Sequence, residues 1–376
     1  MNSIEHIEFS PYKILTLSDH LNRLARNEDV FPVTVELDLV SFCTDNCWWC
    51  VDPKHMNISM KLETVLNILN ELNLLGIKAI VYKGGGEPSL HKQFMEVIKT
   101  TRDYQFETGI VTNGQSLIND YEGIVKFVNY IRISIDGPTP ESHQNIHNVD
   151  DFKRRIEGVK KIVKHRKKLN QRHPVIGLSF AMDYEMIPLI DKAIELGDSL
   201  EVDYILFRPP FFEEVGRQST MTIAQGEKLR SAFTEAKKRY NGHLKIFIDY
   251  WVSDSESDQI SSKKQSPRRG NIMQKGANGI EHITGRCLAT PLMAIITADS
   301  NVYPCCNLRH LNTWCIGAID YKQNISFETI WNSQQRKNIL NRLQKIQCIA
   351  HCTHPLSKYN EAIEYLKSKQ YHHGFV

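Results

Sequence analysis

The sequence predicts an α/β protein in which helices cover a six-stranded parallel sheet, followed by a small cysteine-rich α/β extension. Three observations lead to this prediction. Six short apolar runs alternate with amphipathic runs of about 3.6-residue periodicity. The chain has 376 residues, of which 41% are hydrophobic, so it can bury a large core. Its nine cysteines fall into two groups, one between residues 43 and 50 and one after residue 286.

The predicted strands and helices alternate along the chain. Parallel neighbours in a sheet need crossover connections, and these are right-handed, so repeated βα units place the helices outside one parallel sheet. A helix over 14–26 is expected before the first strand, and a helix over 222–240 and a strand over 244–248 after the last. The six strands are expected over 33–39, 78–83, 106–112, 130–136, 175–182 and 204–208, and the helices between them over 61–75, 92–102, 123–128, 152–169 and 187–196.

The charge and the first residues of the chain argue against several classes of function. The net charge is only +3 and the basic residues are scattered, so nothing favours nucleic acid as a partner. The dense basic run 160–168 has helical spacing and is expected to be a solvated helix face. No apolar run is long enough to span a membrane, and the first residues lack the pattern of a signal peptide. Nine cysteines without an export signal predict a reducing, cytoplasmic location.

The first cysteine group directly follows the first predicted strand. Cys43, Cys47 and Cys50 form a C-x3-C-x2-C motif within the segment 41–50, S-F-C-T-D-N-C-W-W-C. Three thiolates on one loop cannot complete a tetrahedral zinc site without a fourth ligand from elsewhere. They can hold three corners of a [4Fe–4S] cluster and leave the fourth iron open for chemistry. The alternative is three reduced structural thiols.

Polar and glycine-rich segments follow the next three predicted strands, where ligands of parallel sheets gather. G-G-G-E-P occupies 84–88 and T-N-G occupies 112–114. Bare glycine backbone allows a ligand to approach closely, although each segment is also an ordinary turn. On the fourth strand Arg132, Ser134 and Asp136 alternate and so share one face. These three side chains either line a barrel interior that holds a polar ligand or pair with one another.

In this combination the chain resembles the radical S-adenosylmethionine (SAM) enzymes over about residues 33–210. The cysteines match the C-x3-C-x-Φ-C motif of that superfamily, with an aromatic residue at the position expected near the adenine. The segment 85–88 matches the G-G-E-P segment that contacts the methionine amino group, and the fourth strand supplies polar contacts to the ribose or the carboxylate. The cofactor contacts expected on this basis are Trp49, Gly85, Gly86, Glu87, Pro88, Asn113, Ser134 and Asp136.

This resemblance implies a partial (β/α)6, TIM-like barrel in which SAM chelates the open iron through its amino and carboxylate groups. One-electron reduction would cleave SAM to methionine and a 5′-deoxyadenosyl radical, which abstracts hydrogen from the substrate. The protein would orient the reactive carbon and exclude water and oxygen. An external one-electron donor such as flavodoxin or ferredoxin is the implied partner.

The second cysteine group resembles the C-terminal twitch and SPASM extensions of the same enzymes. Residues 299–305, D-S-N-V-Y-P-C, resemble their D-G-x-V-x-P-C turn; Ser300 replaces the glycine, so the turn is expected to be shaped differently. The shorter twitch pattern implies one auxiliary [4Fe–4S] cluster and therefore two clusters in all, with zinc as the alternative. Cys306 and Cys315 are expected to be structural thiols, although Cys306, His351 or His354 could replace a ligand. The expected ligands are Cys287, Cys305, Cys348 and Cys352.

These features divide the chain into four expected parts. Residues 1–30 form a helical lead-in, 31–250 the radical SAM partial barrel, 251–285 a flexible insertion, and 286–376 the auxiliary cluster domain. The insertion is rich in Ser, Asp, Gln, Lys and Gly, and is either a mobile substrate lid or a surface insertion.

The expected reaction is hydrogen abstraction from a small-molecule substrate of sugar, cyclitol or nucleoside type. The auxiliary cluster would then accept an electron, which makes the chain a dehydrogenase-like oxidoreductase. Peptide-modifying relatives often carry an added leader-binding domain, for which no room is expected before Val33. Peptide modification is the alternative, and a zinc- or cluster-stabilised binding protein without turnover is a second one. The candidate substrate contacts are Arg208, Glu213, Glu214 and Arg309, and no general base or hydrogen donor can be identified.

Overall fold

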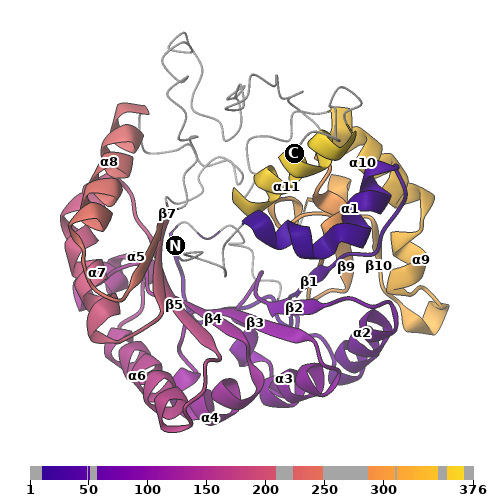
Figure 1. Cartoon of the computed structure of the whole chain (residues 1–376). Helices are drawn as coiled ribbons and strands as arrows, with labels where there is room; N and C mark the ends of the chain where they lie inside the picture. Colours follow the sequence, from indigo (N-terminus) through magenta and orange to yellow (C-terminus); the bar gives the residue numbers. More distant parts are fainter. Residues whose placement is uncertain are drawn as a thin grey trace.

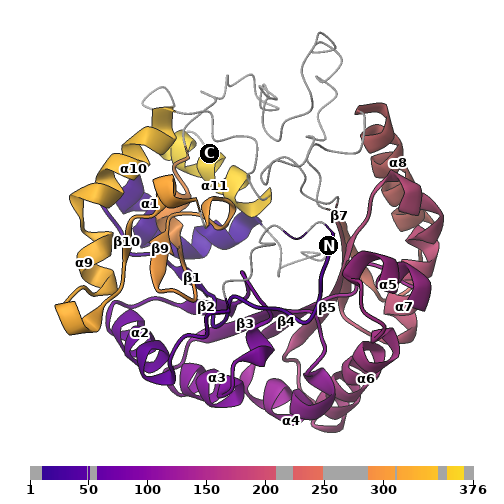
Figure 2. The same cartoon turned by 180° about the vertical axis from the view of Figure 1, so that it is seen from behind.

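The computed structural model describes residues 11–48, 50, 57–208, 223–248, 287–309, 311–345 and 354–367. Within these ranges the chain forms one ten-stranded sheet in the order β10-β9-β8-β1-β2-β3-β4-β5-β6-β7. Figures 1 and 2 show the sheet bent into an open arc, with helices α2, α3, α4, α6, α7 and α8 along its outer side. The partial, unclosed barrel implied by the sequence is confirmed.

Seven parallel strands form the barrel, and each lies within two residues of its predicted ends. Neighbouring strands pair in sequence order from β1 to β7, with apolar residues in register, as where Val35 lies opposite Ile80. The strands are β1 (Thr34–Leu37), β2 (Ala79–Tyr82), β3 (Glu107–Thr112), β4 (Tyr130–Ser134), β5 (Val175–Ala181), β6 (Tyr204–Arg208) and β7 (Lys245–Ile248).

The helices follow the predicted order, with three differences. Helix α4 begins six residues earlier than predicted, because Leu117 is already buried against the core. Helix α5 is absent from the prediction, and α7 follows a 3-10 stretch, Tyr184–Leu189, that contains Pro188. The lysines of the basic run on α6 face solvent as predicted, but Arg166 in the same run is buried and pairs with Asp203. The barrel helices are α2 (Leu62–Leu74), α3 (Phe94–Asp103), α4 (Leu117–Phe127), α5 (Pro140–His147), α6 (Phe152–Lys168), α7 (Ile190–Ser199) and α8 (Ile223–Arg239).

The C-terminal part continues the barrel sheet. β8 (Met293–Ile296) pairs in parallel with β1, so the first barrel strand lies inside the sheet. β9 (Asn301–Tyr303) and β10 (Gly317–Ala318) then add antiparallel strands. The helices that follow are α9 (Phe327–Trp331), α10 (Gln334–Lys345) and α11 (His354–Lys367).

The N-terminal lead-in packs on this C-terminal part. It is a 3-10 stretch, Pro11–Leu17, followed by α1 (Ser18–Ala25), where the sequence predicts one helix over 14–26. α1 lies beside α11 in both views (Figures 1 and 2), and Leu21 and Ile363 belong to the same small buried cluster. None of the helices in the described ranges is long and apolar enough to cross a bilayer.

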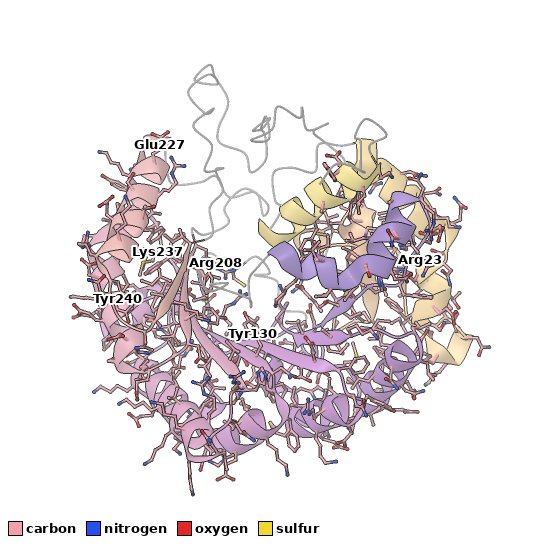
Figure 3. All side chains as sticks on the ribbon, viewed as in Figure 1. Arg23, Tyr130, Arg208, Glu227, Lys237 and Tyr240 are labelled. Atoms are coloured by element: carbon pink, nitrogen blue, oxygen red, sulfur yellow. The ribbon has the colours of Figure 1, made fainter. Side chains whose placement is uncertain are left out.

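The two faces of the barrel strands differ in polarity. On β4, Ile131 and Ile133 are fully buried. Tyr130, Arg132 and Ser134, which alternate with them along the strand, are partly exposed. Figure 3 shows Tyr130 and Arg208 on the inner side of the arc, and Lys237 and Tyr240 on the outer rim. The barrel interior is therefore the more polar side of the sheet at β4.

Candidate functional site

The loop that carries the first three cysteines leaves β1 at its carboxyl end and is fixed by main-chain hydrogen bonds. The Ser41 N–H donates to the carbonyl of Ile58 at 2.9 Å, and the Cys50 N–H donates to the carbonyl of Cys47 at 3.1 Å. Cys43, Cys47 and Cys50 are all partly exposed, and none forms a disulfide. Three thiols that form no disulfide are therefore presented on one short loop.

The glycine-rich segment after β2 meets this loop backbone to backbone. The Glu87 N–H donates to the carbonyl of Phe42 at 3.0 Å. A Cβ on Gly86 would lie 2.2 Å from the Phe42 carbonyl oxygen and 2.6 Å from the Phe42 nitrogen, so only glycine allows the contact. The sequence predicts that the bare backbone admits a ligand, but at Gly86 the cysteine loop fills that space.

Glu87 ties the same segment to the end of β3. Its Oε1 accepts hydrogen bonds from the N–H and hydroxyl of Ser89 at 3.1 and 2.6 Å and from the hydroxyl of Thr112 at 2.6 Å. Its Oε2 accepts from the Asn113 N–H at 2.7 Å. Glu87 is 2% exposed, and burial raises its pKa. Protein donors thus surround this carboxyl group, so its contact with a methionine amino group stays a prediction.

A largely buried group of four charged side chains joins the barrel to the C-terminal part. Glu36 on β1 pairs with Lys83 at 2.6 Å and with Arg309 at 3.0 Å. Asp38 lies 3.5 Å from the Arg309 guanidinium and accepts a hydrogen bond from the Gly85 N–H at 3.2 Å. Arg309, predicted as a substrate contact, has a side chain only 9% exposed and held by barrel carboxylates.

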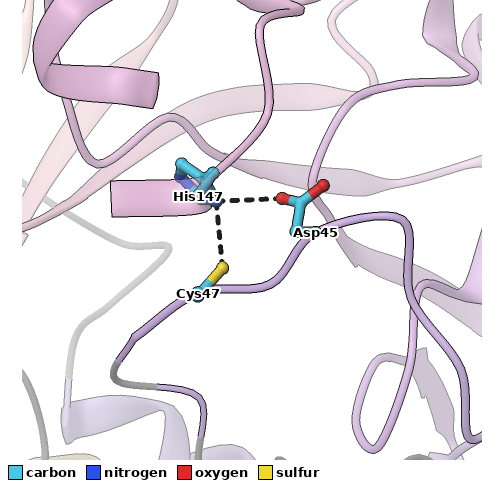
Figure 4. Close-up of side chains that lie close together, drawn as sticks. All are labelled: Asp45, Cys47 and His147. Carbon is cyan, nitrogen blue, oxygen red and sulfur yellow. Dashed lines mark hydrogen bonds and ion pairs between the residues drawn. The ribbon is translucent and has the colours of Figure 1, made fainter. Parts of the chain in front are cut away.

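His147, the last residue of α5, contacts both Cys47 and Asp45 (Figure 4). Its Nδ1 lies 3.1 Å from the Cys47 sulfur and 2.9 Å from Asp45 Oδ2. Its Nε2 lies 3.2 Å from Asp136 Oδ2 and 3.2 Å from the carbonyl oxygen of Ile135. One imidazole therefore connects the cysteine loop to the chain that follows β4.

Arg155 on α6 neutralises the charge of Asp45. Its two terminal nitrogens donate to the two carboxylate oxygens of Asp45 at 3.0 and 2.7 Å, and one also donates to Asp151 at 2.9 Å. The side-chain amide of Asn113 donates to Asp45 Oδ1 and to the hydroxyl oxygen of Thr44, both at 3.0 Å. Arg155 and Asp45 are both buried, so this pair fixes the inner side of the cysteine loop.

The partners of these groups set their charges. Burial opposes the ionisation of Asp45, but hydrogen bonds from His147 and Arg155 lower its pKa to about 2. Burial also opposes protonation of His147, but hydrogen bonds to two carboxylates and to Cys47 raise its pKa well above the usual value. Burial, with the charge of Asp45 next, raises the pKa of the Cys43 thiol to about 12. Cys43 would therefore be a thiolate only when bound to a metal, which deprotonates a coordinating thiol.

The three cysteine sulfurs are spaced more widely than the ligands of a single tetrahedral ion. With Zn–S bonds of about 2.3 Å, a zinc ion would draw its thiolate sulfurs to about 4 Å from one another. In the described part of the chain, only Asp45, Cys47 and His147 bring three possible ligand atoms within 4.8 Å of one another, so the three cysteine sulfurs do not all lie that close together. More widely spaced thiolates on a cysteine-rich loop suit a [4Fe–4S] cluster.

Asp136 departs from the polar pattern of β4. Its φ of +57° turns the chain just after the strand, and it is 3% exposed, whereas Arg132 and Ser134 are partly exposed. Its carboxylate accepts a hydrogen bond from the Ala181 N–H at 2.7 Å and pairs with His147. The partners of Asp136 are therefore His147 and the main chain of Ala181, whereas the alternative that the sequence leaves open pairs it with Arg132 and Ser134. A contact with SAM stays a prediction for Ser134 and Asp136 alike.

The other predicted contacts are only partly described. Pro88 is buried at the start of the 3-10 turn Pro88–Leu90, and Arg208 is partly exposed at the carboxyl end of β6. The remaining predicted residues lie outside the described ranges: Trp49, Glu213, Glu214, Cys348 and Cys352.

Two of the four predicted auxiliary ligands, Cys287 and Cys305, lie within the described ranges, and both are partly exposed. Ser300, in the turn before β9, has a φ of +67°. The turn therefore keeps the left-handed conformation that glycine favours, and the expectation of a differently shaped turn is wrong. The Cys315 thiol donates to the carbonyl of Gly317 at 3.4 Å, as expected of a structural thiol.

Sequence reasoning misses the side chains that support the cysteine loop through Asp45 and Cys47. Three of them, His147, Asp151 and Arg155, come from the connection between β4 and β5, about 100 residues further along the chain. A weak signal exists, because His143 and His147, and Asp151 and Arg155, are spaced i, i+4 and so lie on one side of a helical turn. That spacing alone does not indicate which loop the residues contact.

Comparison with known proteins gives two family matches. Residues 38–179 match the radical SAM superfamily. Residues 287–354 match the SPASM family, an iron–sulfur cluster-binding domain. The first match contains the cysteine loop and the G-G-E-P segment, and the second contains all six C-terminal cysteines.

Two curated proteins show more distant similarity. The chain is 28% identical over 137 residues to a probable GTP 3′,8-cyclase from Pyrococcus abyssi, which covers 35% of this chain and 44% of that protein. It is 24% identical over 241 residues to a PqqA peptide cyclase from Bradyrhizobium diazoefficiens, which covers 59% of each. The chain thus spans about half the length of these relatives.

One group of solved structures shares the fold. A crystal structure of Streptococcus suis SuiB bound to the precursor peptide SuiA is 15% identical and superposes with a TM-score of 0.62. The similarity covers 98% of this chain and 81% of that chain. At this identity it concerns the fold alone.

Proposed function

We propose, from the premise that this chain is a radical SAM enzyme with a C-terminal SPASM-like iron–sulfur domain, that it modifies a peptide by abstracting a hydrogen atom. Its cofactors are SAM, a SAM-binding [4Fe–4S] cluster and an auxiliary cluster. This proposal replaces the small-molecule dehydrogenase reaction, expected from the sequence, as the main interpretation.

A peptide substrate is supported by two separate similarities, one in sequence and one in fold, to proteins whose name or structure title includes a peptide. The PqqA peptide cyclase is similar in sequence over 59% of this chain. SuiB, crystallised with its precursor peptide, shares the fold over 98% of it. A probable GTP 3′,8-cyclase from Thermococcus kodakarensis is 24% identical over 60% of this chain, so sequence coverage alone does not favour the peptide; the peptide-bound SuiB structure adds that support. These curated relatives are named as cyclases, and those names do not indicate a dehydrogenase-like outcome.

The residues of the candidate site would hold the cofactors in a rigid frame. When bound, SAM and its cluster supply a 5′-deoxyadenosyl radical that removes hydrogen from the substrate. We assign Cys43, Cys47 and Cys50 as the cluster ligands, because they are three cysteines outside disulfides on one loop and match the C-x3-C-x2-C spacing. Glu87 and Asn113 lock the G-G-E-P segment, the cysteine loop and the end of β3 together, so thermal motion is restricted where the cofactors would meet.

The test uses the full chain, purified without oxygen and reconstituted with iron and sulfide. Two clusters predict about eight irons, falling to about four when all three cysteines of the loop are replaced by alanine. SAM cleavage, measured as 5′-deoxyadenosine, should disappear in that variant. The substrate is tested with a synthetic peptide from the short reading frame nearest the gene, and a mass change that requires SAM and reductant is expected. About four irons falling to none, with zinc present, would remove the auxiliary cluster from the proposal.

A nucleotide is the second candidate substrate, because the chain is 28% identical to a probable GTP 3′,8-cyclase over part of its length. GTP is therefore added in place of the peptide in the same assay. Conversion of GTP with no change in the peptide would favour the small-molecule alternative.

A further inference from the structure

Both ring nitrogens of His147 face only groups that accept hydrogen bonds. Nε2 lies 3.2 Å from the carbonyl oxygen of Ile135 and 3.2 Å from the Asp136 carboxylate. Nδ1 lies 2.9 Å from Asp45 Oδ2 and 3.1 Å from the Cys47 sulfur. An ionised carboxylate accepts hydrogen bonds and cannot donate one, so each nitrogen carries a hydrogen. The Nδ1 hydrogen is therefore shared between Asp45 and the Cys47 sulfur.

We propose that His147 is a positioning residue for the SAM-binding cluster: its Nδ1–H donates to the Cys47 sulfur, fixes the direction of that ligand and stabilises the reduced cluster. Hydrogen bonds to the sulfurs help to set the potential of an iron–sulfur cluster, and partners of the ligands orient them. Reduction adds negative charge, which an N–H donor and a nearby positive charge favour. The inference rests on the cluster ligands proposed above and not on the identity of the substrate.

The position of His147 in the fold holds it against the cysteine loop. It is 2% exposed and ends α5, where the helix dipole favours a positive charge. The carbonyl of His147 also accepts a hydrogen bond from the Asn46 N–H at 3.0 Å. Main chain and side chain of one residue thus contact the loop on adjacent residues, Asn46 and Cys47.

Asp45, Cys47 and His147 lie close enough together to hold a single divalent ion, if distance were the only criterion. Their hydrogen bonds argue against it. Both oxygens of Asp45 accept hydrogen bonds from the Arg155 guanidinium, whose positive charge would repel a cation. Both nitrogens of His147 carry hydrogens, whereas a metal requires a bare nitrogen. The arrangement in Figure 4 is therefore a hydrogen-bonded support for Cys47.

The chain contains a matched control for this proposal. His143 lies one turn before His147 on α5, and the centroids of the two imidazole rings are 4.4 Å apart. It is 0% exposed and hydrogen-bonds the carbonyl of Ile135 at 2.9 Å and Asp151 at 3.1 Å. Neither of these partners is a cysteine. Replacing His143 removes a buried imidazole from the same helix without removing a hydrogen bond to Cys47.

The experiment compares reconstituted wild type, His147→Leu, His147→Gln and His143→Leu as full chains. Iron and sulfide are counted, and the clusters are titrated with reductant while the EPR signal that changes on adding SAM is followed. At the midpoint potential of wild type, the ratio of reduced to oxidised cluster in His147→Leu is expected to be about tenfold lower. This corresponds to a midpoint potential about 59 mV lower for one electron. His147→Gln keeps an N–H donor and should fall between the two. His143→Leu should match wild type.

An unchanged midpoint in fully loaded His147→Leu would overturn the proposal, and so would an equal shift in His143→Leu. Loss of about four irons from His147→Leu alone would support the ligand-holding role. If both leucine variants lose iron, His147→Gln must recover the iron and show a midpoint potential below that of wild type, or the proposal fails. The iron count reports the cluster independently, so failure of this proposal leaves the proposed function standing.

Discussion

At the scale of single residues, Gly86 is the position on which the contact between the cysteine loop and the G-G-E-P segment depends most directly. A Cβ there would lie 2.2 Å from the Phe42 carbonyl oxygen, and a main-chain atom cannot swing aside as a side chain can. Gly86→Ala should therefore push the two loops apart and weaken the hydrogen bond from the Glu87 N–H to Phe42. We expect it to lower the free energy of unfolding by about 1–3 kcal/mol, as overpacking does, and to reduce the iron bound at the first cysteine group.

Thermal unfolding and iron counting check this expectation against Gly226→Ala as a control. Gly226 lies in α8, and a Cβ there would have nothing within 4 Å. The control should be neutral or stabilise the protein by up to about 1 kcal/mol, because alanine is the better helix former. If Gly86→Ala unfolds at the wild-type temperature and binds its full iron, the close approach of the loops is not needed.

Still at this scale, the sequence identifies the expected cluster ligands but not the side chains that support them. Cys43, Cys47 and Cys50 are adjacent in the chain, so their spacing alone predicts one site. His147 and Arg155 reach the loop only because β4 and the helices after it fold back beside β1. Such contacts depend on tertiary packing between distant segments, and a single sequence does not show which distant segments pack together.

At the scale of elements, α11 supports the segment that begins at Cys287. Asn360 Oδ1 accepts hydrogen bonds from the N–H groups of Leu288 and Ala289, both at 2.7 Å. Asn360→Ala would leave these two donors without that partner, which costs about 1–3 kcal/mol for each one that stays buried. We expect lower stability and loss of iron at the C-terminal cysteines, while SAM binding is retained.

Asn360→Asp is the matched variant, because a carboxylate keeps the acceptor at the same distance from the main chain. It should retain the iron that the alanine variant loses, as measured by iron content and by the EPR signal that does not respond to SAM. Equal iron in all three proteins would mean that α11 does not hold the Cys287 segment.

The sequence predicts a strand or helix where the residues of that element themselves show a regular apolar pattern. The strands are short apolar runs between polar residues, so the sequence places their ends within two residues. α5 was missed because its eight residues, P-E-S-H-Q-N-I-H, include only one aliphatic side chain, Ile146, and so show no apolar periodicity. Its signal is local: Thr139 before Pro140 and Ser142 after it form a capping box at the start of the helix. The start of α4 is hidden by the turn-like T-N-G before it.

At the scale of the whole molecule, Arg309 links the C-terminal part to the barrel. Its guanidinium lies between Glu36 and Asp38 on the β1 side, and Gly84, with φ +128°, leaves room where a Cβ would lie 1.8 Å from the Asp38 carboxylate. Arg309→Met would remove the positive charge and leave buried carboxylates undercompensated. Breaking a buried pair in this way costs about 3–5 kcal/mol.

The exposed pair of Arg239 and Asp191 gives the matched comparison, because both side chains are more than half exposed. Arg239→Met should change the free energy of unfolding by no more than about 1 kcal/mol. Chemical denaturation of both variants separates two roles for Arg309. If Arg309 links the two parts, the Arg309→Met variant unfolds far more easily than Arg239→Met, whether or not substrate is present. If Arg309 is instead the substrate contact that the sequence predicts, the Arg309→Met variant keeps its stability and its SAM cleavage and loses only the modified product. Because Glu36 and Asp38 already hold the guanidinium and leave its side chain 9% exposed, we expect the first result.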